Sequence, residues 1–209
     1  MHEVATSKTR PPRADALRNR GHILDVAEQF FLEHGISGSL DAIAKQAGVG
    51  AGTLYRHFPN REALLAELLT ARDEALVSQR DKLRTEAASA AIALDGWLEA
   101  LTQWAGAFEG LPEPLRAATT VNPSPLAVTC QGFITTTEEF LSAAQNEGSA
   151  RSDVRGRDLF LAALATSWVK GAALADDDSG AALAALTRNG WELTARTIPP
   201  ADSADTKQH

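Results

Sequence analysis

Two short helical segments joined by a glycine turn constrain the fold of this chain more than any other feature of its sequence. Apolar residues at helical spacing predict a helix over residues 40–47, which Ser39 can cap, and a second helix over about residues 51–57. Gly48 between them suits the left-handed backbone of a tight turn, and Pro59 stops the second helix. Because two short helices around such a turn fit a helix-turn-helix, the sequence predicts that motif here.

The alternating glycines Gly48, Gly50 and Gly52 suggest a second interpretation, a loop that cradles the phosphates of a nucleotide. A dinucleotide-binding loop needs a buried strand before the glycines and a long helix after them. Here the preceding residues LDAIAKQA have helical spacing, and Pro59 soon ends the following helix. A Walker-type loop would need Gly-Lys and then Ser or Thr, whereas Gly52 is followed by Thr53. We therefore expect no cofactor.

The composition favours helices over strands, with 44% hydrophobic and 22% charged residues and a single tyrosine among 209 residues. No apolar run approaches the ~20 residues of a membrane span, and the N-terminus lacks the apolar segment of a secretion signal. A cytoplasmic protein without membrane contact is expected. The only cysteine, Cys130, excludes an internal disulfide and a cysteine-based zinc site, and no metal site is expected.

Charge is distributed unevenly along the chain. The formal net charge is −7, but residues 1–61 carry 8 Lys and Arg against 6 Asp and Glu, whereas residues 62–209 carry 12 against 21. This asymmetry predicts a mildly basic small domain joined to an acidic larger one. Charge alone does not identify the partner of either domain.

Glycines, prolines and apolar spacing divide the chain into four segments. Residues 1–13 are expected to be a disordered basic arm, for which a solvated tail is favoured over contact with DNA. Residues 14–60 form the helix-turn-helix domain, residues 61–197 a larger helical domain, and residues 198–209 a disordered tail. The other main helices are expected over residues 14–34, 61–87 with Asn60 as its cap, 126–146, 158–175 and 180–197.

The stretch ILDVAEQFFLEHG, followed by LDAIAKQAGVGAGTLYRHFPNREALLAELL, resembles the N-terminal domain of tetracycline-repressor (TetR) type transcriptional regulators. The resemblance covers about residues 17–69, and its core Gly-Thr-Leu-Tyr-Arg-His-Phe-Pro-Asn-Arg-Glu-Ala-Leu is highly specific. The rest of the chain is similar only in layout, a helical domain with a final helix pair rich in small residues. The resemblance implies an all-α fold with an N-terminal three-helix helix-turn-helix DNA-binding domain and a larger C-terminal helical ligand-binding and dimerisation domain.

The resemblance also implies which residues contact DNA. Tyr55 and His57 would contact phosphates, while Thr53 and its neighbours would enter the major groove. Ala51 departs from the family pattern, since it offers only an apolar contact to a thymine methyl. The alternative for Tyr55 is a packing role, and for Arg61 a solvated charge at the start of a helix. The implied DNA-contacting positions are Ser39, Lys45, Ala51, Gly52, Thr53, Tyr55, Arg56, His57 and Arg61.

An aromatic stripe in the larger domain has two interpretations. Its members share one helix face, which usually means core packing, but the resemblance implies a ligand pocket among the middle helices. The candidate pocket residues are Trp97, Leu101, Trp104, Phe108, Cys130, Phe133, Thr137 and Trp168, with Cys130 as a buried side chain rather than a redox sensor. The candidate dimer-interface residues in the last two helices are Leu161, Leu164, Trp168, Leu183, Leu186 and Leu193.

Together these features predict a ligand-responsive DNA-binding transcriptional regulator, in the first place a repressor released from a palindromic operator by a small apolar or aromatic effector. Its partners would be double-stranded operator DNA, the unidentified small-molecule effector and a second copy in a homodimer. An enzyme is disfavoured, because all five histidines lie in the tails or the N-terminal domain and no nucleophile–base arrangement is found. A transcriptional activator and a helical interaction module without regulated DNA binding stay as alternatives.

Overall fold

The computed structural model describes residues 12–118, 124–169, 172 and 175–193. The expected tail and nearly all of the expected basic arm lie outside these ranges. Within them every regular element is a helix, apart from one isolated antiparallel bridge between Ala150 and Glu192, so the expected all-α fold is confirmed. Their bounds are α1 (Pro12–His34), α2 (Leu40–Gln46), α3 (Ala51–His57), α4 (Arg61–Glu86), α5 (Ala90–Ala105), α6 (Pro112–Ala118), α7 (Pro125–Glu147), α8 (Gly156–Val169) and α9 (Ser179–Trp191). No helix in the described part of the chain is long and apolar enough to pass through a membrane.

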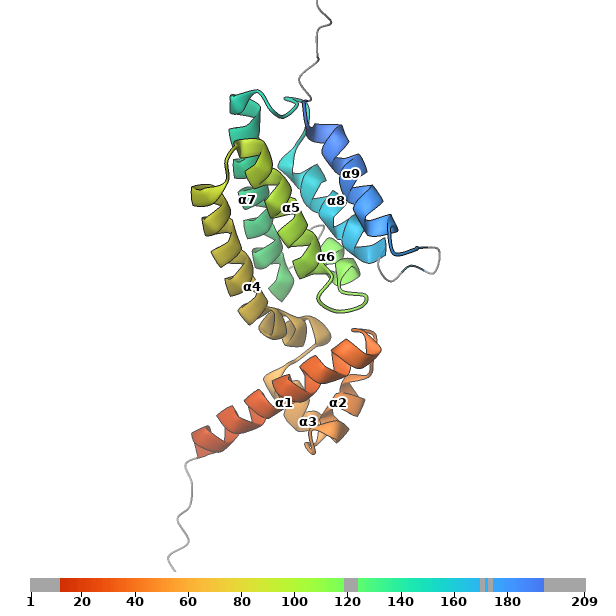
Figure 1. Cartoon of the computed structure of the whole chain (residues 1–209). Coiled ribbons are helices and arrows are strands. Elements are labelled where there is room, and N and C mark those ends of the chain that lie inside the picture. Colours follow the sequence, from red (N-terminus) through yellow and green to blue (C-terminus); the bar gives the residue numbers. More distant parts are fainter. Residues whose placement is uncertain (1–11, 119–123, 170–171, 173–174, 194–209) are drawn as a thin grey trace, which may run out of the picture.

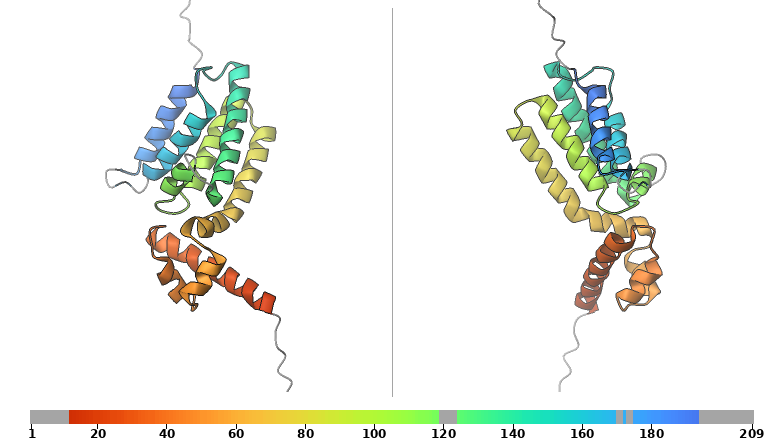
Figure 2. Two further views of the ribbon diagram at one scale, coloured as in Figure 1. Left: turned by 180° about the vertical axis from the view of Figure 1, so that it is seen from behind. Right: turned by 45° about the vertical axis from the view of Figure 1, so that its right-hand side comes forward.

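The helices form two bodies, one above the other (Figure 1). The small N-terminal body holds α1, α2 and α3, and the larger body is built around α5, which packs against α4, α7 and α8. α4 belongs to both bodies, because it contacts α1 near its start and then α5 and α7. Two further views agree that α4 runs from one body into the other (Figure 2), so it links them mechanically.

A single apolar core holds the small body together. Ile23 and Phe31 of α1, Ile43 of α2, Leu54 of α3 and Leu64 of α4 all belong to it and are fully buried. Isolated helices as short as α2 and α3 are unstable in water. Since burying each large apolar side chain contributes roughly 1.5–3 kcal/mol, tertiary packing rather than helix propensity fixes both helices.

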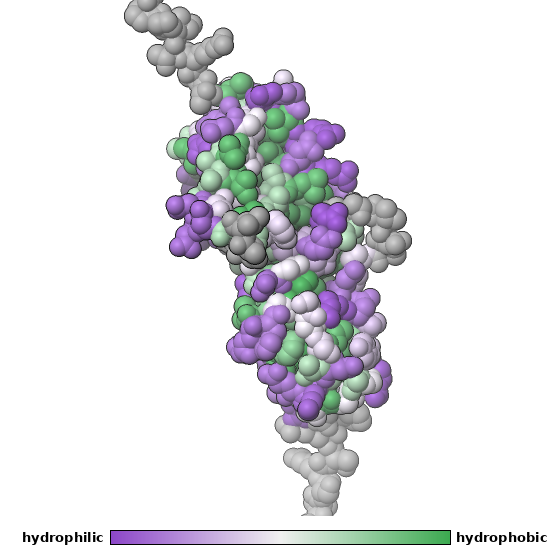
Figure 3. All heavy atoms as spheres, turned by 90° about the vertical axis from the view of Figure 1, so that its right-hand side faces the viewer, coloured by the Kyte–Doolittle hydropathy of each residue, from purple (hydrophilic) through white to green (hydrophobic). Residues whose placement is uncertain are grey.

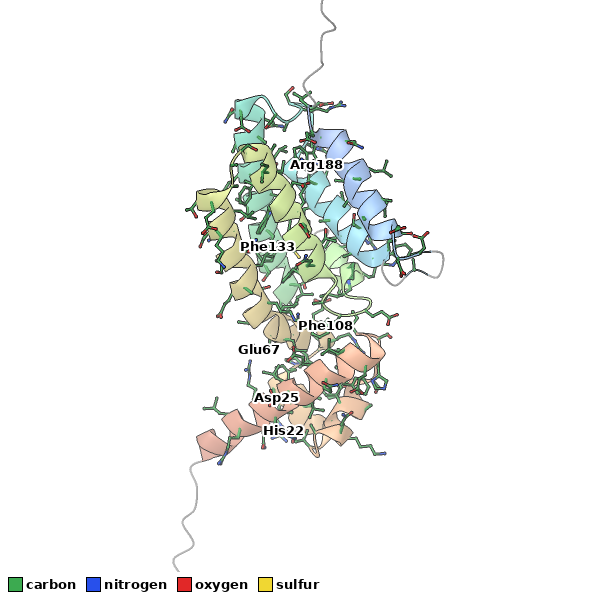
Figure 4. The ribbon with its side chains drawn as sticks, viewed as in Figure 1. His22, Asp25, Glu67, Phe108, Phe133 and Arg188 are labelled. Atoms are coloured by element: carbon green, nitrogen blue, oxygen red, sulfur yellow. The ribbon has the colours of Figure 1, made fainter. Side chains whose placement is uncertain are left out.

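An aromatic cluster fills the larger body between α5 and α7. The ring of Trp97 stacks on Phe140 at a centroid distance of 5.6 Å and meets Phe133 edge to face at 5.9 Å. Trp104 also meets Phe133 edge to face, at 4.9 Å, and Figure 4 shows Phe133 within this body. The indole Nε1 of Trp97 donates to Thr137 Oγ1 at 2.9 Å, so the buried polar atoms of these two side chains are bonded to each other. The aromatic stripe is therefore a packed core.

Three helices differ from the sequence-based expectation by two residues or more. The helix expected over residues 158–175 is α8, which spans Gly156–Val169, and the described residues Ala172 and Ala175 are not helical. α1 begins at Pro12, two residues early, because a proline in the first helical turn loses no hydrogen bond. α9 ends at Trp191, six residues early, because the following chain pairs with the segment after α7. There the N–H of Arg151 donates to the carbonyl of Trp191 at 2.9 Å, and the N–H of Leu193 donates to Ser149 at 2.8 Å.

The loop between α5 and α6 packs against the turn between α1 and α2 and joins the two bodies. The N–H of Ile36 donates to the carbonyl of Glu109 at 2.9 Å. Gly35 and Gly110, on the two sides of this contact, both adopt left-handed backbone, with φ 67° and 82°. A Cβ at Gly110 would lie 3.2 Å from Cγ1 of Ile36, so glycine permits the close approach. Figure 4 shows Phe108 at the same boundary.

Candidate DNA-binding surface

Backbone groups around Gly48 build the turn between α2 and α3. Gly48 has φ 65°, in the left-handed region that glycine adopts without side-chain strain. Its N–H donates to Lys45 at 3.1 Å, and the N–H of Val49 donates to Ala44 at 3.0 Å, so carbonyls at the end of α2 are satisfied. Gly50 then adopts extended backbone as the N-cap of α3. The turn between the two helices is therefore the one that the sequence predicted.

α3 presents an exposed face of small and polar residues. Leu54 is fully buried and fixes the opposite face of the helix in the core. Residues four positions apart share one side of a helix, so the exposed positions form a continuous strip. The strip consists of Ala51, Gly52, Tyr55 and Arg56, with the half-buried Thr53 and His57 beside it. All six α3 positions predicted to contact DNA thus lie at or next to the surface.

Gly50 and Gly52 have no role inside the protein that demands glycine. A Cβ added at either position would meet no atom within 4 Å, and neither residue has left-handed backbone. Alanine is favoured over glycine in a helix by about 0.5–1 kcal/mol, so glycine at position 52 lowers the stability of the fold. A surface without side chains at these positions suits the close approach of another molecule.

Tyr55 and Arg56 differ in how firmly they are held. Tyr55 is 42% exposed, and its hydroxyl lies 3.5 Å from Oδ1 of Asp41 on α2. A hydrogen bond of that length is weak, so the phenol is available to a partner and the packing alternative is not supported. Nε of Arg56 donates to the carbonyl of Gly52 at 3.0 Å, which leaves the other guanidinium N–H groups for a partner.

Ser39 and Lys45 are the exposed α2 residues of the predicted set. Ser39 occupies the N-cap position with extended backbone, as expected, but its side chain accepts no cap hydrogen bond. The expectation of a side-chain cap is therefore wrong, and the hydroxyl faces solvent. Lys45 lies in the last turn of α2, where a cation also interacts favourably with the helix dipole.

Arg61, the first residue of α4, is engaged inside the protein. Its Nη1 donates to the backbone carbonyl of Gly38 at 2.7 Å and to that of Ile36. Its Cζ lies 5.9 Å from the ring centroid of Phe31. The guanidinium thus holds the α1–α2 turn against α4. Arg61 is therefore neither a solvated charge nor a side chain free to bind a phosphate in this structure. Asn60 caps the same helix as expected, accepting the N–H of Ala63 at 2.8 Å.

Arg20 contributes to this body in a way that the sequence did not reveal. Its Nη2 lies 2.6 Å from Oε2 of Glu67 on α4, and its Cζ lies 5.3 Å from the ring centroid of Phe58. The hydrogen bond between the two side chains raises the pKa of Arg20 and lowers that of Glu67. Exposed ion pairs contribute about 0–1 kcal/mol, so this pair orients α1 more than it stabilises the fold.

The candidate pocket residues do not line one cavity. Trp97, Leu101, Trp104, Cys130, Phe133 and Thr137 are buried in the packed core, Phe108 lies at the boundary of the bodies, and Trp168 is 59% exposed on α8. Core packing therefore describes the first six, although Trp104 also borders a pocket between α4 and α5. Burial raises the pKa of the Cys130 thiol to about 12, so it stays protonated.

Asp73 on α4 is an ionisable group in this region that the sequence did not single out. Its Oδ1 accepts a hydrogen bond from Nε1 of Trp104 at 2.8 Å. Burial raises the pKa of the Asp73 carboxyl to about 6, against the lowering effect of hydrogen bonds from Trp104 and Thr129. Asp73 therefore titrates close to neutral pH on the helix that links the two bodies. The sequence did not reveal this role because Asp73 lies between the charged residues Arg72 and Glu74, a pattern that is typical of a solvated helix face.

Exposed apolar side chains gather on the side of the molecule formed by α8 and α9. Figure 3 looks onto this side and shows hydrophobic patches between hydrophilic residues. The predicted interface residues exposed there are Leu161, Trp168, Leu186 and Leu193, with Leu183 half-buried. Leu164 is only 4% exposed and packs inside its own protomer, so its assignment to the interface is wrong.

Two family models match this chain. The model of bacterial regulatory proteins of the tetR family matches residues 23–68, and the C-terminal domain model of SbtR-like transcriptional regulators matches residues 89–192. A curated HTH-type transcriptional regulator from Staphylococcus aureus is 45% identical over 53 residues, which is 25% of this chain and 29% of that protein. The chain thus matches less than a third of the length of these curated relatives.

Solved structures are similar over most of the chain. The TetR transcriptional regulator from Streptomyces coelicolor is 31% identical with a TM-score of 0.54, over 84% of this chain and 99% of that one. The transcriptional regulator FadR from Bacillus subtilis, solved in complex with stearoyl-CoA, is 20% identical with a TM-score of 0.58, over 81% and 95%. At that identity the second likeness shows the fold alone.

Proposed function

Because the chain belongs to the TetR family of bacterial regulatory proteins, we propose that it is a ligand-responsive repressor, released from a palindromic operator by a small apolar or aromatic effector. The protein is a transcriptional regulator with a helix-turn-helix DNA-binding domain, and it is not an enzyme.

The side-chain-free start of α3 is the observation that carries the DNA-contact part of the proposal. Gly52 costs helix stability, and neither Gly50 nor Gly52 makes a contact inside the protein that demands glycine. In the major groove they let the backbone of α3 approach the base edges closely, with Thr53 as the adjacent polar group. Tyr55 lies one turn from Ala51 on the same strip, so its hydroxyl reaches the flanking phosphates.

Contacts of α4 and the α5–α6 loop with α1 couple the larger body, where a ligand would bind, to the DNA-binding body. On α4, Nη2 of Arg72 lies 3.3 Å from Oε1 of Glu28 on α1, and its Cζ lies 5.2 Å from the ring centroid of Phe108. Phe108 in turn meets Phe31 of α1 edge to face at 6.1 Å. A ligand that favours one position of α4 or α5 therefore shifts α1, and it changes DNA affinity through its unequal affinity for the two arrangements.

A homodimer would pair the exposed apolar face of α8 and α9 with the same face of a second copy. Trp168 and Leu186 supply the largest exposed apolar area there, at 59% and 66% exposure. A two-fold pair presents two copies of α3, which matches a palindrome whose half-sites lie roughly 34–36 Å apart. Leu186→Arg is expected to abolish this pairing and, with it, tight operator binding.

The proposal is tested by a fluorescence anisotropy titration of the full chain with DNA from the promoter beside its own gene. We expect tighter binding to this fragment than to a scrambled one, and an affinity that falls steeply between about 50 and about 200 mM salt as counterions are displaced. Equal affinity for both fragments, or an affinity insensitive to salt, would refute phosphate-based operator recognition. Transcription from that promoter must then rise when the gene is deleted, since a fall would indicate an activator.

A further inference from the structure

A pocket of about 640 Å³ lies between α5, α8 and α9. It is separate from the aromatic core, and its volume is typical of small-molecule sites, which run from about 300 to about 1,000 Å³. Its lining combines polar and apolar side chains, and all three helices contribute apolar ones. The larger apolar side chains are Leu98, Leu159, Val169 and Trp191.

Trp191 forms a buried part of the pocket wall. The side chain is 1% exposed, and its indole N–H has no hydrogen-bond partner in the part of the chain that the structure describes. Buried donors in proteins are nearly always bonded. The position of Trp191 is set by its backbone, whose carbonyl accepts the N–H of Arg151. The nitrogen itself is inaccessible, so no ligand atom in the pocket can bond it, and Trp191 contributes only apolar wall.

The mouth of the pocket is acidic. Among its described lining residues four are acidic and none is basic, and one of the four, Asp95, is paired with Arg188 at 2.8 Å. Glu99, Asp176 and Asp177 have no such cation beside them among the described residues, and all three are exposed. The hydroxyl of Ser179 donates to Asp176 and lowers the pKa of its carboxyl, which keeps it ionised. Three carboxylates together attract a positive group.

The pocket and the exposed apolar face of α8 and α9 occupy different sides of α9. Gly180, Ala184, Thr187 and Trp191 follow each other at steps of three or four residues, so they share the pocket side. Leu186 is turned away from that side and is 66% exposed. Pairing of two copies through Leu186 therefore leaves the pocket available to a ligand.

We propose that this pocket binds an organic cation with an apolar body. The body lies on Leu98, Leu159 and Trp191, and the positive group faces Glu99, Asp176 and Asp177. The inference deepens the proposed effector response by naming the chemistry of the effector, and it rests on that function only for the consequence at DNA.

The test is a calorimetric titration of the DNA-free full chain with three ligands that share one aryl ether body: phenoxypropylamine, phenoxypropanol and phenoxypropanoate. The amine is expected to bind most tightly and the carboxylate most weakly, about 10-fold or more apart, because several carboxylates act on one charge. The double variant Glu99→Gln, Asp177→Asn is expected to weaken the amine by about 3- to 10-fold and to leave the alcohol unchanged. Equal binding of the three ligands, or tightest binding of the alcohol or the carboxylate, overturns the proposal.

A matched control variant sharpens the result. Glu86→Gln removes an exposed carboxylate on α4 that does not line the pocket, so this variant must bind the amine as tightly as the wild type. If Glu86→Gln weakens amine binding as much as the double variant does, the proposal is overturned.

The titration separates this inference from the proposed function, because it contains no DNA. If the wild type binds the amine but not operator DNA, the pocket stands and the repressor proposal fails. If operator DNA is bound and none of the three ligands is, the cation pocket fails while DNA binding stands.

Discussion

Replacing Gly52 by alanine separates what the fold requires from what DNA requires. A Cβ at this position meets no protein atom within 4 Å, so alanine fits without a clash. The better helix propensity of alanine is expected to raise the free energy of unfolding by about 0.5–1 kcal/mol. The same methyl group would stand between α3 and the DNA groove. Overpacking a close contact costs about 1–3 kcal/mol, so operator affinity is expected to fall by about 5- to 150-fold.

Gly132→Ala is the matched control. Gly132 lies inside α7 in the larger body, is exposed, and also leaves a Cβ with no neighbour within 4 Å. Urea unfolding followed by tryptophan fluorescence is expected to show a similar stabilisation for both variants. Anisotropy titrations are expected to show weakened operator binding for Gly52→Ala alone. If Gly52→Ala binds operator DNA as tightly as wild type and Gly132→Ala, the backbone of α3 does not approach DNA closely and the reasoning fails.

Three further outcomes are expected. Gly110→Ala should lower the free energy of unfolding by more than the roughly 1–2 kcal/mol that left-handed backbone alone costs, because its Cβ would press on Ile36. The control is Gly148→Ala, which has φ 79° and no neighbour within 4 Å and therefore shows the backbone cost alone. Equal losses for the two variants in urea unfolding would contradict the contact between Gly110 and Ile36. Arg61→Lys keeps the positive charge but loses the paired hydrogen bonds to the carbonyls of Ile36 and Gly38, so the melting temperature should fall by several degrees. A weakened DNA affinity with an unchanged melting temperature would instead indicate that Arg61 contacts phosphate. The raised pKa of Asp73 means that the folded state binds its proton more tightly than the unfolded state, so its contribution to the free energy of unfolding is full below about pH 4 and is lost as the pH rises to about 6. Between these two pH values the free energy of unfolding should decline in the wild type but not in Asp73→Asn. Equal pH dependence of the two proteins would contradict a raised pKa for Asp73.

The helix-turn-helix could be predicted because its signals are local. Gly48 and Pro59 act on their own neighbourhoods, and the spacing of Ile43 and Leu54 reports which side of each helix is buried. The role of Arg61 could not be predicted, because its partner Gly38 lies 23 residues away and no sequence pattern links a guanidinium to distant carbonyls.

The larger body shows the limit of hydrophobic periodicity. The spacing of Trp97 and Trp104 places them on one helix face, but the same spacing fits a packed core and a pocket wall. The structure resolves the choice through their contacts with Phe133, which fill the space between α5 and α7. Trp191 lay within the predicted final helix, and its place in a pocket wall depends on α5 and α8, which the local sequence does not encode.

The central claim is that the exposed strip of α3 holds operator DNA through Tyr55. Its most direct test is the operator affinity of Tyr55→Ala relative to wild type, measured by anisotropy on protein whose dimer mass is verified by light scattering. Hydrogen bonds to charged groups contribute about 1.5–3 kcal/mol, so an intact dimer with about 10- to 150-fold weaker operator binding is predicted. An intact Tyr55→Ala dimer that binds the operator with wild-type affinity would contradict the claim.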